Sequence, residues 1–376
     1  YSIIHCDYTE STSIDSLTAT EAVQADAQYL ADMGAPFIVG PATSSMSEDA
    51  YGVIESAGVL MISPSATSPA LTDIDGIEKS DDNPGLFWRT APPDDLQGRV
   101  VAQDMNSRGI HDVAVIYETS NYGQALAEVF KSYFEATSPN TAELFPFDEG
   151  NNTGRDTQVA TVGTSSYEEV LFISGKIDDV IAFLKGASSL SGFDDMGIFL
   201  TDAGRDTKLL ENTTEAAALY DQIRGSAPSV PTGTVYGFFE SGFNAVYSPT
   251  YTASDSSYTA YSYDAAWLGL YGSAWSLYQE AEVCGTDDDG ICGLGAAKGL
   301  RRISDPASDL TEIKATSWNY VKATFEVGQT INVEGASGHL DYDPTTEETA
   351  GPVDIWRIND QGNGFETIET VDPDSP

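Results

Sequence analysis

The chain of 376 residues carries 59 acidic residues against 17 lysines and arginines, and its formal net charge is −42. A surface this negative repels phosphate backbones and anionic lipids, which argues against binding to nucleic acid or to an anionic membrane surface. Because the chain is longer than one simple core requires, we expect two lobes. The dispersed, lysine-poor acid is typical of adaptation to high salt, where ions screen the self-repulsion; an acidic secreted protein is the alternative.

In the first part of the chain, short apolar strands alternate with amphipathic helices. Val23, Ala27, Leu30 and Met33 share one face of the first helix, and Gly34 ends it. We expect strands at 1–8, 36–40, 59–63 and 86–90, and helices at 18–33 and 46–57.

The alternation then starts again, and Asp94 or Asp95 is the expected cap of its first helix. We expect helices at 94–108, 122–136 and 177–187, and strands at 112–118, 142–147, 168–174 and 196–201. After a linker at 225–233, we expect helices at 256–281, 294–303 and 308–325, and an antiparallel finish of strands at 338–343, 352–358 and 365–371. The pattern predicts an α/β fold with mostly parallel, doubly wound sheets.

Two stretches of small hydroxyl residues leave the ends of neighbouring strands, "GPATSS" at 40–45 and "SPSATSP" at 63–69. Ligands of open parallel sheets bind beyond the carboxyl ends of the strands. Hydroxyls, free backbone amides and a helix N-terminus can hold a small anionic or zwitterionic group there without a buried cation. Either stretch alone is better explained as ordinary N-capping. The presence of both, on neighbouring strands, favours a ligand site.

The cysteines indicate an oxidising compartment. Cys284 and Cys292 lie eight residues apart in a polar, glycine-rich loop, which predicts a small disulfide; two free thiols are the alternative. Cys6 lies in an apolar run and is expected to be buried.

No pattern in the sequence predicts a metal, a cofactor or catalysis. His5, His111 and His339 are scattered without metal-ligand spacing, and neither a nucleophile elbow nor a phosphate-binding glycine loop is present. The acidic turn at 286–290 loosely resembles a calcium loop but lacks the later bidentate acid. We therefore expect no metal site and no enzyme.

The segment "FIVGPATSSMSEDAYGVIESAGVLMISPSATSPALT" resembles part of the branched-chain amino-acid-binding proteins, the type I periplasmic binding proteins of ABC importers. The resemblance continues in chain order through "LFWRTAPPDDLQG", "VAVIYETSNYGQALAEVF", "EEVLFISGKIDDVIAFL", "GIFLTDAG", "YTAYSYDAAWLGL" and "GASGHLDYDPTTEETAGPVDIWRI". It implies two α/β lobes joined by three crossovers, near 92, 227 and 337, and a ligand cleft between them. Lobe one would then comprise 1–92 plus 228–337, and lobe two 93–227 plus 338–376.

The resemblance also implies roles for single residues. The ligand carboxylate would meet the hydroxyls and amides at Ser44, with Ser45 beside it, and at Thr67. The ligand ammonium would meet the carbonyl of Ser65. Tyr122 and Asp202 match ligand-contacting positions of the second lobe; a structural tyrosine at a helix start and a helix N-cap are the alternatives.

The sequence departs from the family pattern at two places. Lys176 stands where branched-chain binders have an aromatic contact, and it would either select a ligand with an extra acidic group or point to solvent. Family members also have roughly 40 further residues before the strand at 1–8, more than one βαβ unit requires. We expect that the strand and helix which these residues form in lobe one were lost by truncation, together with the export signal; cleavage of the chain and a differently built lobe one are the alternatives.

The resemblance implies an extracytoplasmic solute receptor that binds an amino acid or a similar small ligand and delivers it to a membrane ABC permease. We expect a monomer without a cofactor. A sensor of the same fold that binds an amide, urea or another small molecule is the alternative, since fold does not determine function. An enzyme would need a nucleophile–base pair, and the sequence offers none that is convincing.

Overall fold

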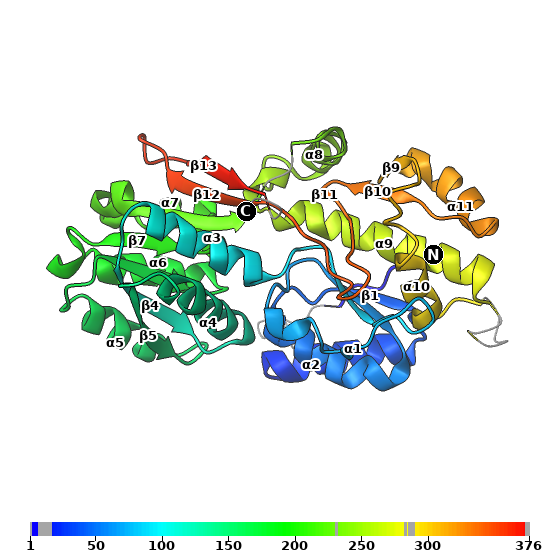
Figure 1. Ribbon diagram of the computed structural model, residues 1–376, viewed down its shortest axis with the longest axis horizontal. Coiled ribbons are helices and arrows are strands. Elements are labelled where there is room, and N and C mark those ends of the chain that lie inside the picture. The colour runs from blue at the N-terminus through cyan, green and yellow to red at the C-terminus, as the bar shows by residue number, and fades with distance from the viewer. Residues whose placement is uncertain (1, 7–16, 230–231, 282–283, 285–289, 373–376) are drawn as a thin grey trace. The chain divides into compact units, whose positions relative to one another are not determined.

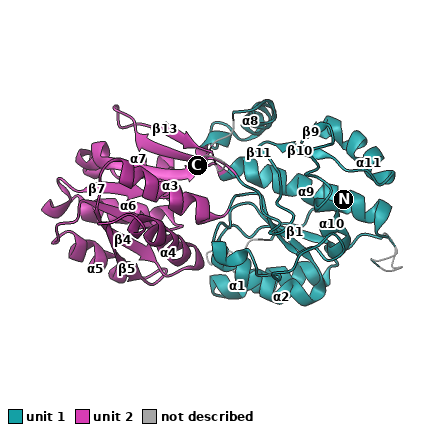
Figure 2. Cartoon of the chain, in the orientation of Figure 1, with its two compact units in different colours: residues 1–92, 231–254, 258–350 teal, residues 93–230, 255–257, 351–376 magenta. Residues whose placement is uncertain are grey.

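The computed structural model describes residues 2–6, 17–229, 232–281, 284 and 290–372. The chain divides into two compact units, shown in Figure 2. Unit 1 comprises residues 1–92, 231–254 and 258–350, and unit 2 comprises 93–230, 255–257 and 351–376. The chain therefore passes between units after 92, 230 and 350, and a short excursion at 255–257 adds two further passages; the sequence analysis expected three crossovers, near 92, 227 and 337.

The first sheet of unit 1 is parallel, with the strand order β1-β2-β3. Its strands are β1 (Phe37–Val39), β2 (Leu60–Ser63) and β3 (Phe87–Arg89), and they are preceded by α1 (Ala19–Asp32) and interrupted by α2 (Ser44–Ile54) (Figure 1). Val23 and Ala27 of α1 pack with Tyr51 and Ile54 of α2 over Met61 of the sheet. The helical face predicted for α1 is therefore confirmed at these two positions, but Met33 is 57% exposed.

The strand expected at 1–8 is wrong where the structure describes it. Residues 2–6 have no regular structure, and Ile3 is 96% exposed. A strand requires a paired neighbour, and this run pairs with none of the described strands. Cys6, expected to be buried, is a half-buried free thiol within the described residues.

The rest of unit 1 consists of helices around a small mixed sheet, with the strand order β11-β10-β9. The elements are α8 (Thr234–Tyr247), α9 (Tyr258–Gln279), α10 (Gly293–Leu300), β9 (Leu310–Glu312), α11 (Trp318–Glu326), β10 (Asn332–Gly335) and β11 (Gly338–His339). Helix α9 lies directly on the parallel sheet, since a Cβ atom at Gly269 would come within 2.1 Å of the Phe37 ring. The helix expected at 308–325 begins only at Trp318, because β9 pairs in parallel with β10.

Unit 2 is a seven-stranded sheet with the order β13-β12-β8-β7-β6-β4-β5. The strands are β4 (Asp112–Glu118), β5 (Thr141–Phe147), β6 (Glu169–Ile173), β7 (Gly197–Leu200), β8 (Ile223–Pro228), β12 (Val353–Ile358) and β13 (Phe365–Val371). From β5 to β8 all pairs are parallel, whereas β12 and β13 add antiparallel strands at the edge. The predicted antiparallel finish is thus confirmed for the strands at 352–358 and 365–371, whereas the strand expected at 338–343 is reduced to the two residues of β11, which pairs with β10 in unit 1.

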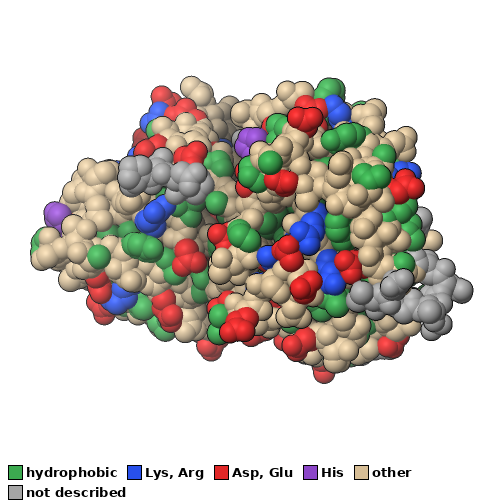
Figure 3. Space-filling view, turned by 45° about the vertical axis from the view of Figure 1, so that its right-hand side comes forward, with side chains coloured by type: hydrophobic (Ala, Val, Ile, Leu, Met, Phe, Trp, Pro, Cys, Tyr) green, Lys and Arg blue, Asp and Glu red, His purple; other side chains and the backbone are tan. Residues whose placement is uncertain are grey.

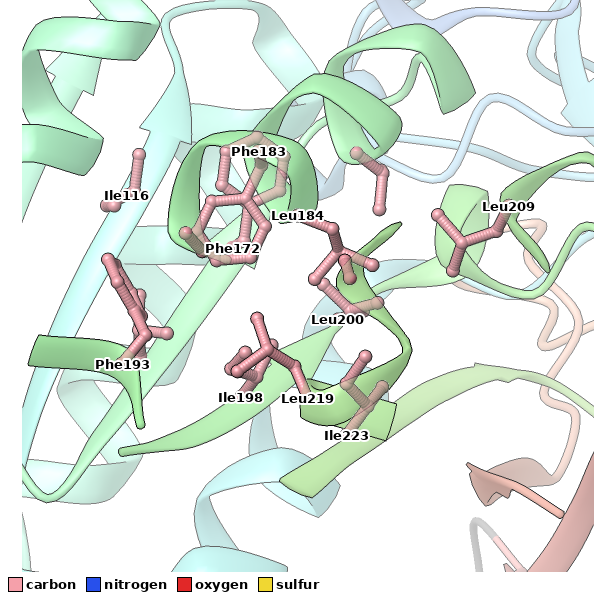
Figure 4. Close-up of a cluster of buried hydrophobic side chains, with 14 of the residues drawn as sticks. Ile116, Phe172, Phe183, Leu184, Phe193, Ile198, Leu200, Leu209, Leu219 and Ile223 are labelled. Carbon is pink, nitrogen blue, oxygen red and sulfur yellow. The ribbon is translucent and has the colours of Figure 1, made fainter. Parts of the chain in front are cut away.

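Helices cover both faces of this sheet. They are α3 (Asp94–Ser107), α4 (Asn121–Glu135), α5 (Asn152–Val162), α6 (Ile177–Ala187) and α7 (Thr207–Asn212). Val113 and Val115 of β4 pack with α3 and α4, while Ala114 and Ile116 pack with α5, α6 and α7 on the other face. Figure 4 shows this second core, in which Phe172 and Phe183 stack with ring centroids 4.3 Å apart. Successive side chains of β4 are therefore buried alternately under one helical layer and the other. This is the doubly wound arrangement predicted from the sequence.

Three details of unit 2 differ from the expected pattern. Helix α5 was not expected, and the expected linker at 225–233 contains most of β8. Neither Asp94 nor Asp95 caps α3; Pro93 holds the N-cap position and both acids lie in the first turn. Short 3₁₀ helices connect elements in both units, at Glu55–Ala57, Pro69–Leu71, Ser191–Phe193, Asp202–Gly204, Thr214–Gln222, Ala253–Asp255 and Ala315–Ser317.

A disulfide joins Cys284 to Cys292 next to α10, with Cα atoms 5.3 Å apart. The acidic turn considered for calcium lies, apart from Gly290, outside the described residues. Within the described ranges, no helix has the length and apolar character needed to cross a membrane. Figure 3 shows acidic side chains scattered over the visible face rather than gathered in one patch.

Candidate ligand-binding site

The two hydroxyl stretches of unit 1 lie against each other beyond the ends of β1 and β2. The Ser65 hydroxyl donates to the carbonyl of Ala42 at 2.7 Å, and the Ser68 amide donates to the Ser44 hydroxyl oxygen at 3.2 Å. The Ser63 hydroxyl also donates to the carbonyl of Pro41 at 2.7 Å. These three hydrogen bonds hold both loops in one polar surface at the carboxyl edge of the parallel sheet.

Ordinary capping is performed by neighbours of the predicted ligand residues. Thr43 is the N-cap of α2 and accepts the amide of Met46, so Ser44 is the first helical residue instead. Ser68 caps the 3₁₀ helix that begins at Pro69. The capping alternative therefore accounts for Thr43 and Ser68 but leaves Ser44 and Thr67 without such a role.

The four predicted residues of unit 1 differ in what they can still offer. Ser44 and Thr67 are each 2% exposed, and the Thr67 hydroxyl makes no hydrogen bond to any residue in the described part of the chain. Ser65 uses its hydroxyl on Ala42, so its backbone carbonyl is what remains for an ammonium group. Ser45 is half-buried at the start of α2. This surface offers hydrogen-bond donors, as a carboxylate requires.

Tyr122 lies in the first turn of α4 in unit 2 and is 8% exposed. Burial, followed by the charges of Asp202 and Asp94, holds the pKa of Tyr122 well above its usual range. The Thr201 side chain lies close enough to oppose this rise, but neither hydroxyl makes a hydrogen bond of ordinary geometry to a described residue. Two buried hydroxyls near two carboxylates therefore remain available at this edge of the sheet.

Asp202 follows β7 and begins a 3₁₀ helix whose N-cap is Thr201, so the capping alternative for Asp202 fails. Its Oδ1 accepts from Nε2 of Gln97 at 2.5 Å. The same Gln97 nitrogen donates to the Ser226 hydroxyl at 2.9 Å, and Gln97 is 3% exposed. Gln97 thus fixes the Asp202 carboxylate beside the end of β8.

Glu118 ends β4 and is 3% exposed. Its carboxylate accepts the hydroxyls of Ser120 and Ser174, each at 2.9 Å, and the amide of Gly175 at 2.8 Å. Burial raises the pKa of Glu118, and these hydrogen bonds oppose the rise. The residue joins the ends of β4 and β6 and adds a third acid to this edge of unit 2.

Lys176 is the N-cap residue of α6, with a side chain that is 49% exposed. Its Nζ lies 2.9 Å from Oε1 of Glu149. Burial by itself would lower the pKa of Lys176, but the hydrogen bond and the charge of Glu149 outweigh it and raise the pKa. Since Glu149 compensates this cation, the reason to expect an extra acidic group on the ligand is weakened.

The structure gathers Ser44, Ser45, Ser65 and Thr67 in unit 1, and Tyr122 and Asp202 in unit 2. The sequence analysis missed Gln97, Thr201, Glu118 and the buried Arg89 of unit 1. Arg89 and Gln97 lie in the segment "LFWRTAPPDDLQG", which contributed to the sequence analysis only through its resemblance to the branched-chain amino-acid-binding proteins. Among the described residues, no cluster of three or more His, Cys, Asp or Glu could hold a metal ion.

Comparisons with known proteins agree with this picture. The family described as "Receptor family ligand binding region" matches residues 7–361. An uncharacterized protein of Methanocaldococcus jannaschii is 28% identical over 193 residues, 47% of this chain and 44% of that protein. The leucine-, isoleucine-, valine-, threonine- and alanine-binding protein of Pseudomonas aeruginosa is 32% identical over 141 residues, 37% of this chain and 34% of that protein. The matches thus span less than half the length of these curated relatives.

Two solved structures show the same fold. A leucine-binding protein of Thermotoga maritima superposes with a TM-score of 0.69 at 16% identity, over 94% of this chain and 85% of that chain. A solute-binding protein of an ABC transporter from R. palustris, in complex with 4-hydroxybenzoate, gives a TM-score of 0.70 at 14% identity, over 96% and 85%. The type I periplasmic binding protein fold and the resemblance to branched-chain amino-acid-binding proteins are thereby confirmed.

Proposed function

The chain belongs to the receptor family of ligand-binding regions, and on this premise we propose that it is an extracytoplasmic solute receptor for an amino acid. It would deliver that ligand, as a monomer and without catalysis or cofactor, to a membrane ABC permease. Relatives and structural neighbours with the names of amino-acid-binding proteins support this proposal.

The contact between the two hydroxyl loops of unit 1 is the observation that carries the proposal. Ser44 and Thr67 are buried polar residues without a capping role, and Thr67 keeps its hydroxyl unpaired among the described residues. This hydroxyl is not among the fully buried, unpaired polar atoms of the described residues, so it is open to a ligand or to water. A carboxylate supplies the missing acceptor and would form charge-assisted hydrogen bonds.

The acids of unit 2 favour an amino acid over an aromatic acid such as the 4-hydroxybenzoate held by one neighbour. Asp202, fixed by Gln97, and the nearby Asp94 form an acceptor for an ammonium group, and a benzoate has none. Tyr122 would donate to the same ligand. In this proposal residues of both units hold one ligand, and binding shifts the population toward a closed form.

A sensor with the same site is the second candidate, and the fold does not separate the two roles. Both roles require ligand binding, which thermal unfolding in high salt measures directly. The panel should contain the amino acids, their amides, urea and hydroxybenzoates. A ligand at 1,000 times its dissociation constant stabilises the fold by about 4 kcal/mol. A shift with amino acids alone supports the proposal; a shift with only amides or urea favours the sensor; a shift with only benzoates contradicts the role of Asp202.

A further inference from the structure

Arg89 is the last residue of β3, and its side chain is completely buried behind the loop that carries Thr67. Its Nη1 donates to the carbonyl of Ala66 at 3.2 Å and to that of Ser68 at 2.7 Å. Nη2 donates to the Thr72 hydroxyl at 3.1 Å. One guanidinium therefore binds the two carbonyls that flank Thr67.

These bonds determine where the loop directs its own donors. The peptide between Ala66 and Thr67 is trans, so its N–H points opposite to its carbonyl. Because that carbonyl faces Arg89, the Thr67 amide faces away from Arg89. Nor does this amide donate to another residue of the described chain.

The guanidinium has a counterion, Glu348, which Nη2 contacts directly. The two side chains are 1% and 11% exposed. Arg89 lies shortly before residue 92 and Glu348 shortly before residue 350, the ends of two segments at which the chain leaves unit 1. The ion pair thus joins the Thr67 loop to both of these segments.

We propose that Arg89 is a positioning residue that makes the Thr67 loop selective for a carboxylate. It orients the Thr67 amide and hydroxyl for the ligand, and Glu348 holds the guanidinium in place. The inference rests on the proposed function and assigns the acid specificity of the same site to a group that does not touch the ligand.

The test compares acids with their amides, in which an uncharged NH2 group replaces one of the two carboxylate oxygens. We would measure the affinity of wild type, Arg89→Lys, Thr67→Val and the double variant for L-leucine, L-leucinamide, 4-hydroxybenzoate and 4-hydroxybenzamide. Lysine keeps the charge but cannot bridge both carbonyls and Glu348 in a fork. Arg89→Lys should weaken binding of the acid by roughly 10–100-fold, the range for hydrogen bonds to a charged group, and binding of the amide by much less. The losses of the two single variants should be far from additive, because both act through one loop.

Lys79→Met is the matched control. Lys79 is also a buried cation, and it joins the carbonyls of Thr72 and Thr346 at 2.9 and 3.0 Å without touching the loop at 66–68. It should lower stability and leave the preference for acid over amide unchanged. Equal losses of acid and amide in Arg89→Lys, or additive losses with Thr67→Val, would overturn the proposal.

Glu348→Gln keeps the proposal testable if Arg89→Lys does not fold. Glutamine retains an acceptor for Arg89 but removes its countercharge, so the preference for acid should stay the same or rise, and a fall would contradict the role of Arg89. A wild-type chain that binds neither acid contradicts the proposed function for these ligands, and the inference fails with it.

Discussion

The amide of Ser68 donates to the hydroxyl of Ser44 across 24 residues of sequence, and this bond fastens the two ligand loops to each other. Thr67 precedes Ser68 in the loop that Arg89 also contacts, yet its own hydroxyl is unpaired among the described residues. The loop is therefore held rigidly by its neighbours while the side chain it presents remains available. Preorganisation of this kind lowers the ordering cost of binding.

Thr67→Val should separate binding from folding. Valine has nearly the same shape, and the lost hydroxyl has no hydrogen bond to break, so the unliganded melting temperature should stay nearly unchanged. Ligand binding should weaken by about 1–3 kcal/mol, because a ligand acceptor loses its donor. Calorimetric titration with the ligand found in the panel measures this loss. Thr311→Val, at a buried threonine on β9, is the control and should leave affinity intact. Unchanged affinity in Thr67→Val would mean that the loops serve only as caps.

Asp202→Asn tests the ammonium site of unit 2. Asparagine keeps the shape but loses the charge. Its NH2 group can also take the place of the oxygen that accepts from Gln97, so that two donors oppose each other. Amino-acid affinity should fall by roughly 10–100-fold, whereas a ligand without an ammonium group should lose little. Titration of both ligand types into wild type and variant checks this. An equal loss for both types would assign Asp202 a structural role.

Lys176→Met tests whether this lysine selects an acidic ligand. The side chain is half exposed and paired with Glu149, and exposed ion pairs contribute roughly 0–1 kcal/mol. We expect stability and affinity for neutral amino acids to change little. Titration with glutamate alongside leucine provides the comparison. A selective loss of glutamate binding would instead place Lys176 against the ligand.

The sequence predicted the regular part of the fold well. Helix α6 and strand β4 have the expected bounds, because strong periodicity and clear ends mark both. Helix α5 was not predicted because only three of its residues are buried, Arg155, Val159 and Val162, and one of these three is charged. Helix α8 escaped notice because its aromatics are spread around it, with Phe238 60% exposed. Strand β9 exists only through its pairing with β10, which local pattern does not reveal.

For the candidate site, the sequence predicted the residues that would face a ligand but not those that hold them. Ser44 and Thr67 follow apolar strands, which is a local signal. The roles of Arg89 and Gln97 depend on contacts with residues 17 to 259 positions away. A buried arginine in a short strand looks unfavourable in sequence, because burial of a charge is costly without a partner. Its partners become visible only when the chain is folded.

Asp264 makes the stability of the protein depend on pH. It lies on α9, is fully buried, and accepts the amides of Ala336 and Ser337 at 2.8 and 2.7 Å and the Ser337 hydroxyl at 2.6 Å. Burial outweighs these hydrogen bonds and raises the pKa of Asp264 to about 7, from 3.8. Between these values the folded protein retains a proton that the unfolded chain has released. Stability from this group is therefore full below pH 4 and is lost as the pH rises toward 7.

A shift of this size corresponds to roughly 4 kcal/mol in the free energy of unfolding. Chemical unfolding of wild type and Asp264→Asn at a series of pH values from 4 to 8, in high salt, isolates the contribution. Asparagine cannot accept all three donors, so the variant should be less stable throughout. The difference between the two proteins should nevertheless shrink as the pH rises, because only the wild type pays for deprotonation. A difference that stays constant between pH 5 and 8 would show that Asp264 is already ionised in the folded protein at low pH.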